Sequence, residues 1–223
     1  GLSRLNRDGH LPYPAPDMLE LFDLAGQVHT ATGGVFDPSI QPLWLAVATG
    51  GDISAARALV GWNDVQVTAK EIRLMRPGMA LTFNGIAQGA AADRIAALMR
   101  REGFDNVMID MGEVMALGQR PGGGGWRAAI ETPQGTPVAR RKLQNRALAT
   151  SAPTGTRIGP KGQDAHIINP TGHAPVWQLV SVEADQAALA DALSTAFCLM
   201  DRKAIDATMT AFPDTAVAAL VRV

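Results

Sequence analysis

Residues 185–200 read Asp-Gln-Ala-Ala-Leu-Ala-Asp-Ala-Leu-Ser-Thr-Ala-Phe-Cys-Leu-Met, and this stretch predicts one long apolar helix. Asp191 and Thr195 are four residues apart, so they share one face of that helix. A carboxylate and a hydroxyl on one face are hard oxygen ligands of the kind that Mg²⁺ prefers. The spacing is common in helices, however. On its own it favours a solvated Asp191 and a Thr195 that packs against the preceding turn.

A second long helix is predicted over residues 85–101, an alanine-rich stretch followed by Gly103. Shorter helices are expected at 18–28, 43–47, 54–60 and 202–211. Short strands, several of them in hairpins, are expected at 65–67, 72–74, 79–83, 107–109, 114–117, 126–130, 147–151, 167–168, 179–182 and 215–221. Strict alternation of strand and helix is absent. We therefore predict an α+β fold with mixed or antiparallel sheets and two long helices.

The composition narrows the classes of function. The chain has 223 residues, 47% hydrophobic and 18% charged, with a formal net charge of -1. This balance excludes the basic footprint of a nucleic-acid-binding protein, so no nucleic-acid partner is expected. A single cysteine, Cys198, excludes an internal disulfide and a cysteine-based zinc site. Its apolar neighbours predict a buried thiol rather than a catalytic one.

Two further segments carry groups suited to chemistry. Residues 84–89, Asn-Gly-Ile-Ala-Gln-Gly, lie where a predicted strand enters a helix. Such a junction can cradle a phosphate at the helix N-terminus, or it can simply pack tightly, and the sequence favours neither. His166 precedes the short apolar stretch 167–168. It could act as an acid or base, but without context a structural hydrogen bond is favoured.

Two hydroxyl- and glycine-containing segments are also ambiguous. Thr150 and Ser151 end a predicted strand, but no serine-hydrolase elbow surrounds them, so a role in satisfying the loop is favoured. Residues 32–38, Thr-Gly-Gly-Val-Phe-Asp-Pro, could bind a ring-bearing ligand. They could equally form a helix C-cap followed by an Asx turn.

The order of these segments along the chain resembles the ApbE family, the FAD:protein FMN transferases. The resemblance covers essentially the whole chain and is carried by residues 3–6, 33–38, 42–44, 84–89, Asp93, 111–113, 149–151, 166–172 and 190–196. Within the family the sequence is most similar to the NosX-like branch, which is tied to nitrous-oxide reductase maturation. The resemblance implies an ApbE-like, T-fold-related architecture in which residues 1–223 form a single domain that lacks its N-terminal strand region.

The resemblance also implies an activity. Members bind FAD as substrate together with Mg²⁺, and they attach FMN to a Thr or Ser hydroxyl of a partner protein with release of AMP. By position, the metal ligands are Gly85 through its backbone carbonyl, Asp191, Ser194 and Thr195. His166 is the catalytic residue and touches FAD. The remaining flavin-nucleotide contacts are Val35, Phe36, Asp37, Thr82 and Gln88.

The family context predicts a respiratory or electron-transfer protein as the flavin acceptor, and a periplasmic location. The chain starts at Gly1 rather than at Met and opens directly on residues 2–6, with no turn or helix cap before them. We therefore expect a missing N-terminal segment that could provide membrane anchoring. Two alternatives remain open. Some members hydrolyse FAD to FMN and AMP, as an FAD pyrophosphatase would. Departures from the family pattern at Gln88 and Asn169 motivate a non-catalytic flavin-binding assembly factor.

Overall fold

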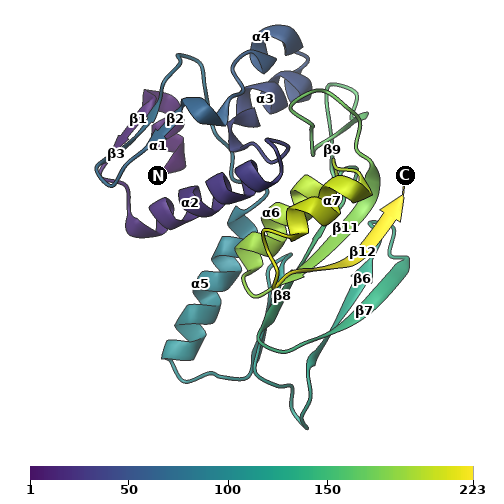
Figure 1. Cartoon of the computed structure of the whole chain (residues 1–223). Helices are drawn as coiled ribbons and strands as arrows, with labels where there is room; N and C mark the ends of the chain where they lie inside the picture. Colours follow the sequence, from purple (N-terminus) through teal and green to yellow (C-terminus); the bar gives the residue numbers. More distant parts are fainter. Residues whose placement is uncertain (223) are drawn as a thin grey trace.

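A five-stranded antiparallel sheet with strand order β12-β11-β8-β5-β4 is the largest element of the computed structural model, which describes residues 1–222 (Figure 1). Its strands are β4 (Val107–Asp110), β5 (Val114–Leu117), β8 (Arg146–Ser151), β11 (Trp177–Ala184) and β12 (Ala216–Arg222). The small sheet near the N-terminus has the order β1-β3-β2, formed by β1 (His10–Pro12), β2 (Val65–Val67) and β3 (Glu71–Leu74). Two antiparallel hairpins complete the strands: β6 (Trp126–Glu131) with β7 (Pro137–Leu143), and β9 (Arg157–Ile158) with β10 (Asp164–Ala165).

Seven α-helices surround these sheets within residues 1–222: α1 (Leu2–Asp8), α2 (Pro16–Ala31), α3 (Gln41–Thr49), α4 (Ile53–Arg57), α5 (Ala87–Arg101), α6 (Ala187–Phe197) and α7 (Arg202–Met209). Helix α6 lies across one face of the large sheet, against β8 and β11, and also packs on α5 and α2 (Figure 1). The α+β fold with antiparallel sheets is therefore confirmed. The two longest helices are α2, with 16 residues, and α5, with 15, whereas the helix expected at 185–200 is shorter, with 11 residues in α6. Within the described residues, no helix is both long and apolar enough to cross a bilayer.

Helix α6 is buried nearly all round, and its alanines explain how. Every residue from Ala187 to Ser194 is buried. Small side chains let the sheet and two helices approach its axis closely, while Leu193 and Phe197 fill the spaces between them. Full burial of side chains of this size contributes roughly 1.5–3 kcal/mol each. Helix α6 is thus the centre of the larger apolar cluster, and its polar residues are held in fixed positions.

The opposite face of the large sheet is covered by the β6–β7 hairpin. Ala128, Ile130 and Leu143 of the hairpin pack with Leu148 and Leu179 of the sheet in a second apolar cluster. Alternation along the strands separates the two faces, since Ala147 and Ala149 of β8 belong to the helix-side cluster. The sheet is therefore buried on both faces over its central strands.

Two of the strand predictions, at residues 79–83 and 167–168, are wrong, because neither segment forms a strand. Residues 79–83 form no ladder, because the Asn6 side chain takes the backbone bonds of Leu81: its Oδ1 accepts from Leu81 N and its Nδ2 donates to Leu81 O, both at 2.8 Å. The Thr82 N–H donates to the Pro38 carbonyl at 2.8 Å. Residues 167–168 are also outside any strand. Seven elements were not predicted: α1, β1, β7, β9, β10 and the two 3₁₀ helices at Pro38–Ile40 and Trp62–Asp64.

Helices α5 and α6 meet at Gly89, in the first turn of α5. A Cβ placed on Gly89 would overlap the Ala187 carbonyl oxygen and lie 2.7 Å from the Ala188 Cα. Both neighbours are backbone atoms, so neither can rotate away. The missing side chain is what permits the start of α6 to approach α5 so closely. Asp93, one turn further along α5, accepts hydrogen bonds from Ala187 N at 2.8 Å and Ala188 N at 2.9 Å, and so caps the N-terminus of α6.

Gly89→Ala is therefore expected to destabilise the protein by about 1–3 kcal/mol through overpacking. The matched control is Gly26→Ala in α2, where a Cβ would meet only Trp62 Nε1, at 3.5 Å. Alanine is the better helix former, so the control should be neutral or stabilised by up to about 1 kcal/mol. Urea unfolding midpoints measure both. Equal midpoints for the Gly89 variant and the parent chain would contradict the close-contact account.

Candidate functional site

A cavity of about 480 Å³ lies between the end of β8, the N-terminal end of α5 and one face of α6. Nine of the ten site residues predicted from the sequence line it: Val35, Phe36, Asp37, Thr82, Gly85, Gln88, His166, Asp191 and Thr195. A second, larger hollow of about 1120 Å³ is a more open groove between α2, β2 and the end of α7. Of the predicted site residues none lies in that groove, so the smaller cavity is the candidate site.

Asp191 is the buried acid of this cavity. Its side chain is 3% exposed, and the N–H of Gly89 donates to one carboxylate oxygen at 3.1 Å. Burial raises the pKa of Asp191 to about 7, against which the Gly89 hydrogen bond acts only in part. Within residues 1–222 no cation pairs with this carboxylate. The fold thus holds a carboxylate where its charged form lacks a positive partner.

Thr195 and Gly85 face each other beside Asp191. A Cβ on Gly85 would lie 3.0 Å from the Thr195 Oγ1 and 2.9 Å from its Cγ2, so only glycine leaves this approach open. Ser194 is placed differently. It is completely buried and does not line the cavity; its hydroxyl donates to the Asp191 carbonyl at 3.0 Å and lies 2.7 Å from the Ser151 Oγ.

Glu113 is a second buried acid in the same cavity. The family resemblance included it in residues 111–113 without assigning it a role. Its side chain is 6% exposed, and its carboxylate accepts from the Thr150 N–H at 3.2 Å. Burial, and then the negative charge of Asp191, raise the pKa of Glu113 to about 8. Ser151 also lines the cavity, with its Oγ 3.3 Å from the Thr195 Oγ1. Apart from the resemblance of residues 111–113 to the family, the sequence signal for Glu113 is an acid in a strand-to-strand turn, a position usually exposed.

His166 is held by backbone carbonyls. Its Nδ1 lies 2.9 Å from Pro153 O and 3.1 Å from Thr156 O, and its own carbonyl accepts from Trp44 Nε1 at 3.0 Å. Carbonyl oxygens only accept, so this network assigns the proton of neutral His166 to Nδ1. Nε2 is then left with a free lone pair in a side chain that lines the cavity. This tautomer is the one that can accept a proton from a bound hydroxyl.

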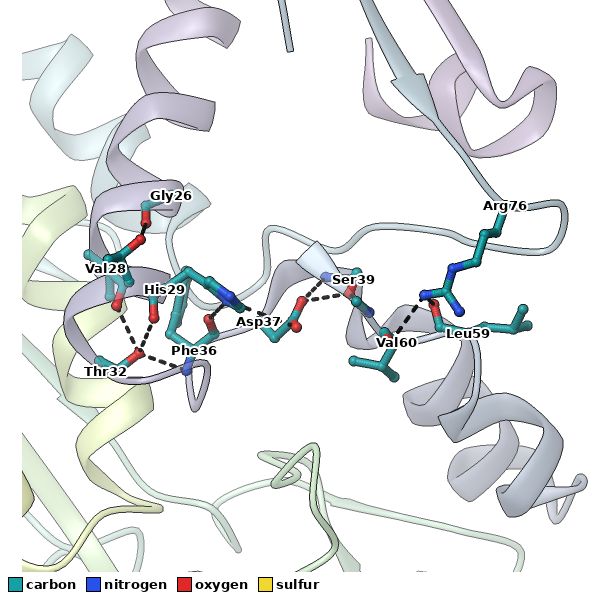
Figure 2. A network of polar contacts seen from close by, with 12 residues as sticks. Gly26, Val28, His29, Thr32, Phe36, Asp37, Ser39, Leu59, Val60 and Arg76 are labelled. Carbon is teal, nitrogen blue, oxygen red and sulfur yellow. Dashed lines mark hydrogen bonds and ion pairs between the residues drawn. The ribbon is translucent and has the colours of Figure 1, made fainter. Parts of the chain in front are cut away.

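A network of polar contacts fixes the Val35-Phe36-Asp37 loop (Figure 2). The Phe36 N–H donates to Thr32 Oγ1 at 3.1 Å, and the Phe36 carbonyl accepts from His29 Nδ1 at 2.8 Å. Asp37 Oδ1 accepts from both the backbone N–H and the hydroxyl of Ser39, at 2.8 and 2.6 Å. The Ser39 N–H bond to Asp37 is an Asx turn, and the Gly34 N–H donates to the His29 carbonyl at 2.9 Å as a helix C-cap does. The structural alternative for this segment is therefore present, and because Val35, Phe36 and Asp37 also line the cavity, it does not exclude a ligand role.

Thr82 and Gln88 complete the lining. Thr82 accepts from the Asn84 N–H at 3.2 Å, and the Gln88 amide donates to the Met111 carbonyl at 3.3 Å. The Thr82 contact is local, whereas the Gln88 contact joins α5 to the turn between β4 and β5; each side chain stays at the cavity wall with hydrogen-bonding capacity to spare. The site thus combines buried acids, hydroxyls, a histidine with a free nitrogen, and a rigid loop that carries an aromatic ring.

Residues 1–220 match the ApbE family. The chain belongs to the ApbE family. Among its relatives, the FAD:protein FMN transferase of Vibrio cholerae is 29% identical over 74% of this chain and 51% of its own length. The FAD:protein FMN transferase of Rhodobacter capsulatus is 28% identical over 82% of this chain and 38% of its own length. The chain spans about half the length of the curated relatives it matches.

Solved structures agree with the ApbE fold. The ApbE protein of Thermotoga maritima superposes with a TM-score of 0.84 over 99% of this chain and 80% of its own, at 22% identity. The apo flavinyl transferase ApbE of Pseudomonas stutzeri superposes with a TM-score of 0.76 over 94% of this chain and 72% of its own, at 27% identity. These likenesses confirm the predicted ApbE-like architecture.

The cavity of this ApbE protein fits a magnesium ion by the chemistry of its donors. Asp191 supplies one carboxylate, Thr195 a hydroxyl, and Gly85 leaves its backbone open beside them. Within the described residues there is no group of three or more His, Cys, Asp or Glu side chains that could hold a metal alone. That pattern suits Mg²⁺, which is commonly bound by one or two carboxylates, waters and substrate phosphates.

The raised pKa of Asp191 predicts how stability depends on pH in the metal-free protein. Between the unfolded pKa near 4 and the folded pKa of about 7, the folded state binds the extra proton. The contribution of this proton to stability is complete below about pH 4 and is lost as the pH rises through about 7. The Asp191→Asn variant has no carboxyl group to ionise at this position, so it does not lose this stability. The melting temperature of the variant should therefore rise relative to that of wild type between pH 5 and pH 8.

At pH 8, Mg²⁺ should reverse the difference in melting temperature between Asp191→Asn and wild type, since the ion binds only the ionised carboxylate. Wild type should gain thermal stability on addition of the ion, and Asp191→Asn should gain none. Melting curves with and without chelator measure both effects. A difference between the two proteins that is constant from pH 5 to pH 8, with equal responses to Mg²⁺, would contradict the assignment of Asp191.

Proposed function

We propose that this chain carries the catalytic site of a Mg²⁺-dependent FAD:protein FMN transferase, which attaches FMN covalently to a Thr or Ser of a partner protein and releases AMP. The observation that carries the proposal is the joint placement of Asp191, Thr195 and Gly85 in one cavity with His166. Membership of the ApbE family and relatives that are FAD:protein FMN transferases support the same function. The NosX-like assignment remains a prediction.

FAD is the substrate in this proposal, and its parts match the walls of the cavity. The Val35-Phe36-Asp37 loop, held by the contacts of Figure 2, offers an aromatic ring, a carboxylate and backbone groups to the flavin nucleotide. Thr82 and Gln88 offer uncharged hydrogen-bonding groups. The pyrophosphate is assigned to the end of the cavity near Gly85, because the start of α5 follows there and a helix N-terminus favours phosphate.

The same end of the cavity would hold Mg²⁺ through the Asp191 carboxylate, the Thr195 hydroxyl and the Gly85 carbonyl. When bound, the ion neutralises the charge that develops on the phosphate oxygens as the pyrophosphate breaks. Ser194 stabilises the position of Asp191, since its hydroxyl hydrogen-bonds to the Asp191 carbonyl and to the Ser151 hydroxyl. We assign Ser194 to positioning because it does not line the cavity.

His166 takes the proton in the proposed transfer. The acceptor hydroxyl oxygen bonds to the phosphorus of the FMN phosphate, the bond between that phosphorus and the bridging oxygen breaks, and AMP leaves with that oxygen. The hydroxyl proton goes to Nε2 of His166, because Nδ1 is already committed to the Pro153 and Thr156 carbonyls. A positioned base of this kind contributes on the order of 10²–10⁴-fold to the rate.

The acceptor we propose is a respiratory or electron-transfer protein in the periplasm. The deciding experiment incubates this protein with FAD, Mg²⁺ and a candidate acceptor, and follows the intact mass of the acceptor. An FMN-sized addition on one Thr or Ser is the expected result. Rapid release of FMN and AMP without an acceptor would favour the FAD pyrophosphatase, and bound FAD that stays intact would favour the non-catalytic assembly factor.

His166→Ala should lower the rate of FMN transfer by roughly 10²–10⁴-fold, because the acceptor proton loses its base. FAD affinity should change much less, which fluorescence titration of FAD measures separately. His173→Ala is the matched control, since His173 is exposed and its Nδ1 lies 2.8 Å from the hydroxyl of the neighbouring Thr171. Full transfer activity in His166→Ala would refute the role of this histidine.

A further inference from the structure

The outer face of the β6–β7 hairpin concentrates positive charge. Arg127 lies opposite Lys142 in the antiparallel register, and Arg140 lies opposite Ala129. Directly opposed residues point to the same side of a sheet. The intervening residues Ala128 and Ile130 are buried against the large sheet, so Arg127, Arg140 and Lys142 all point outward and are exposed. We call these three residues the basic face.

The cations of the basic face form no ion pair, although Glu131, exposed at the end of β6, lies on the same side of the strand as Arg127. Among the ion pairs formed within residues 1–222, none involves any of the three. Like charges directly opposite each other on neighbouring strands are destabilising, and Arg127 faces Lys142 in this way. The Arg127–Lys142 repulsion therefore costs the fold a small amount of free energy, and no ion pair within residues 1–222 offsets it.

The hairpin also ends at the catalytic cavity. Its turn, residues 132–136, lies against the loop that follows β8: a Cβ on Gly155 would be 3.6 Å from the Pro133 Cγ. Gly155 itself lines the cavity. Strand β6 runs from Arg127 towards that turn, with Glu131 as its last residue. The basic face thus extends outward from the rim of the cavity.

We propose that the basic face binds an acidic segment of the acceptor protein and so presents the acceptor hydroxyl to the cavity. This inference rests on the proposed FMN transfer. FAD occupies the cavity, so the macromolecular substrate must be recognised by surface outside it. Complementary charge at the rim speeds encounter and fixes orientation. An acidic protein segment fits better than an anionic lipid surface, because none of the large apolar side chains exposed within residues 1–222 lies on this hairpin.

The test uses fluorescein-labelled peptides of about twelve residues that contain one Thr beside a run of Asp, and the same peptides with Asn for each Asp. Wild type should bind the Asp peptide roughly tenfold more tightly than the Asn peptide at low salt, and the preference should fall with added salt. The triple variant Arg127→Gln, Arg140→Gln, Lys142→Gln should lose the preference. It should fold at least as well as wild type, since it removes like-charge repulsion.

A matched control removes three exposed cations elsewhere: Arg100→Gln, Arg101→Gln, Lys203→Gln. Its net charge equals that of the basic-face variant, and it should keep the preference. Equal peptide binding by wild type and the basic-face variant would overturn the proposal. The proposal would also be overturned if the basic-face variant lost only its binding to vesicles of phosphatidylglycerol and phosphatidylcholine. The basic face would then be a membrane contact.

Mass spectrometry of the same peptides after incubation with FAD and Mg²⁺ separates this inference from the proposed function. Charge-dependent binding without an FMN-sized addition would support the docking surface and count against transfer. Equal FMN addition to the Asp and Asn peptides by wild type and the basic-face variant would support transfer and overturn the docking surface.

Discussion

The close approach of α5 to the first turn of α6, made at Gly89, is the contact on which the site depends. The Ala187 carbonyl occupies the space that a side chain at position 89 would need. Two hydrogen-bonding links then fix the relative position of the helices: Asp93 of α5 caps the start of α6, and the Gly89 N–H donates to Asp191. Because α6 is buried against the sheet as well, Asp191 has little freedom to move.

This arrangement has an electrostatic consequence. Two carboxyl groups, Asp191 and Glu113, are enclosed in one cavity, and their negative charges oppose each other while burial opposes both. The hydrogen bonds from Gly89 and Thr150 offset only part of this penalty. A divalent cation at Asp191 would favour the ionised form of both acids. The folding free energy lost by burying the acids would thus be recovered when the site is loaded, a common relation between metal binding and stability.

The sequence predicted the parts of the site that lie on regular elements. The spacing of Asp191 and Thr195 follows from helical periodicity, and both line the cavity. The resemblance to the ApbE family, and not the local pattern, predicted that Asp191 and Thr195 lie beside Gly85 and His166. Gly85 is about a hundred positions away in the sequence, and a local pattern carries no information on contacts over that separation. Glu113 was missed because its burial is set by neighbouring segments, and Ser194 faces inward although its neighbour Thr195 faces the cavity. The strand expected at 79–83 fails for a similar reason, since the distant Asn6 takes its backbone bonds.

The central claim is that the face of α6 holds a divalent ion beside the FAD pyrophosphate, and a crystal structure with FAD and Mg²⁺ tests it most directly. The account predicts an ion about 2.0–2.1 Å from the Asp191 carboxylate, the Thr195 hydroxyl and the Gly85 carbonyl, with the remaining positions taken by phosphate oxygens and water. An ion that touches the pyrophosphate but not Asp191, or FAD bound outside this cavity, would contradict it.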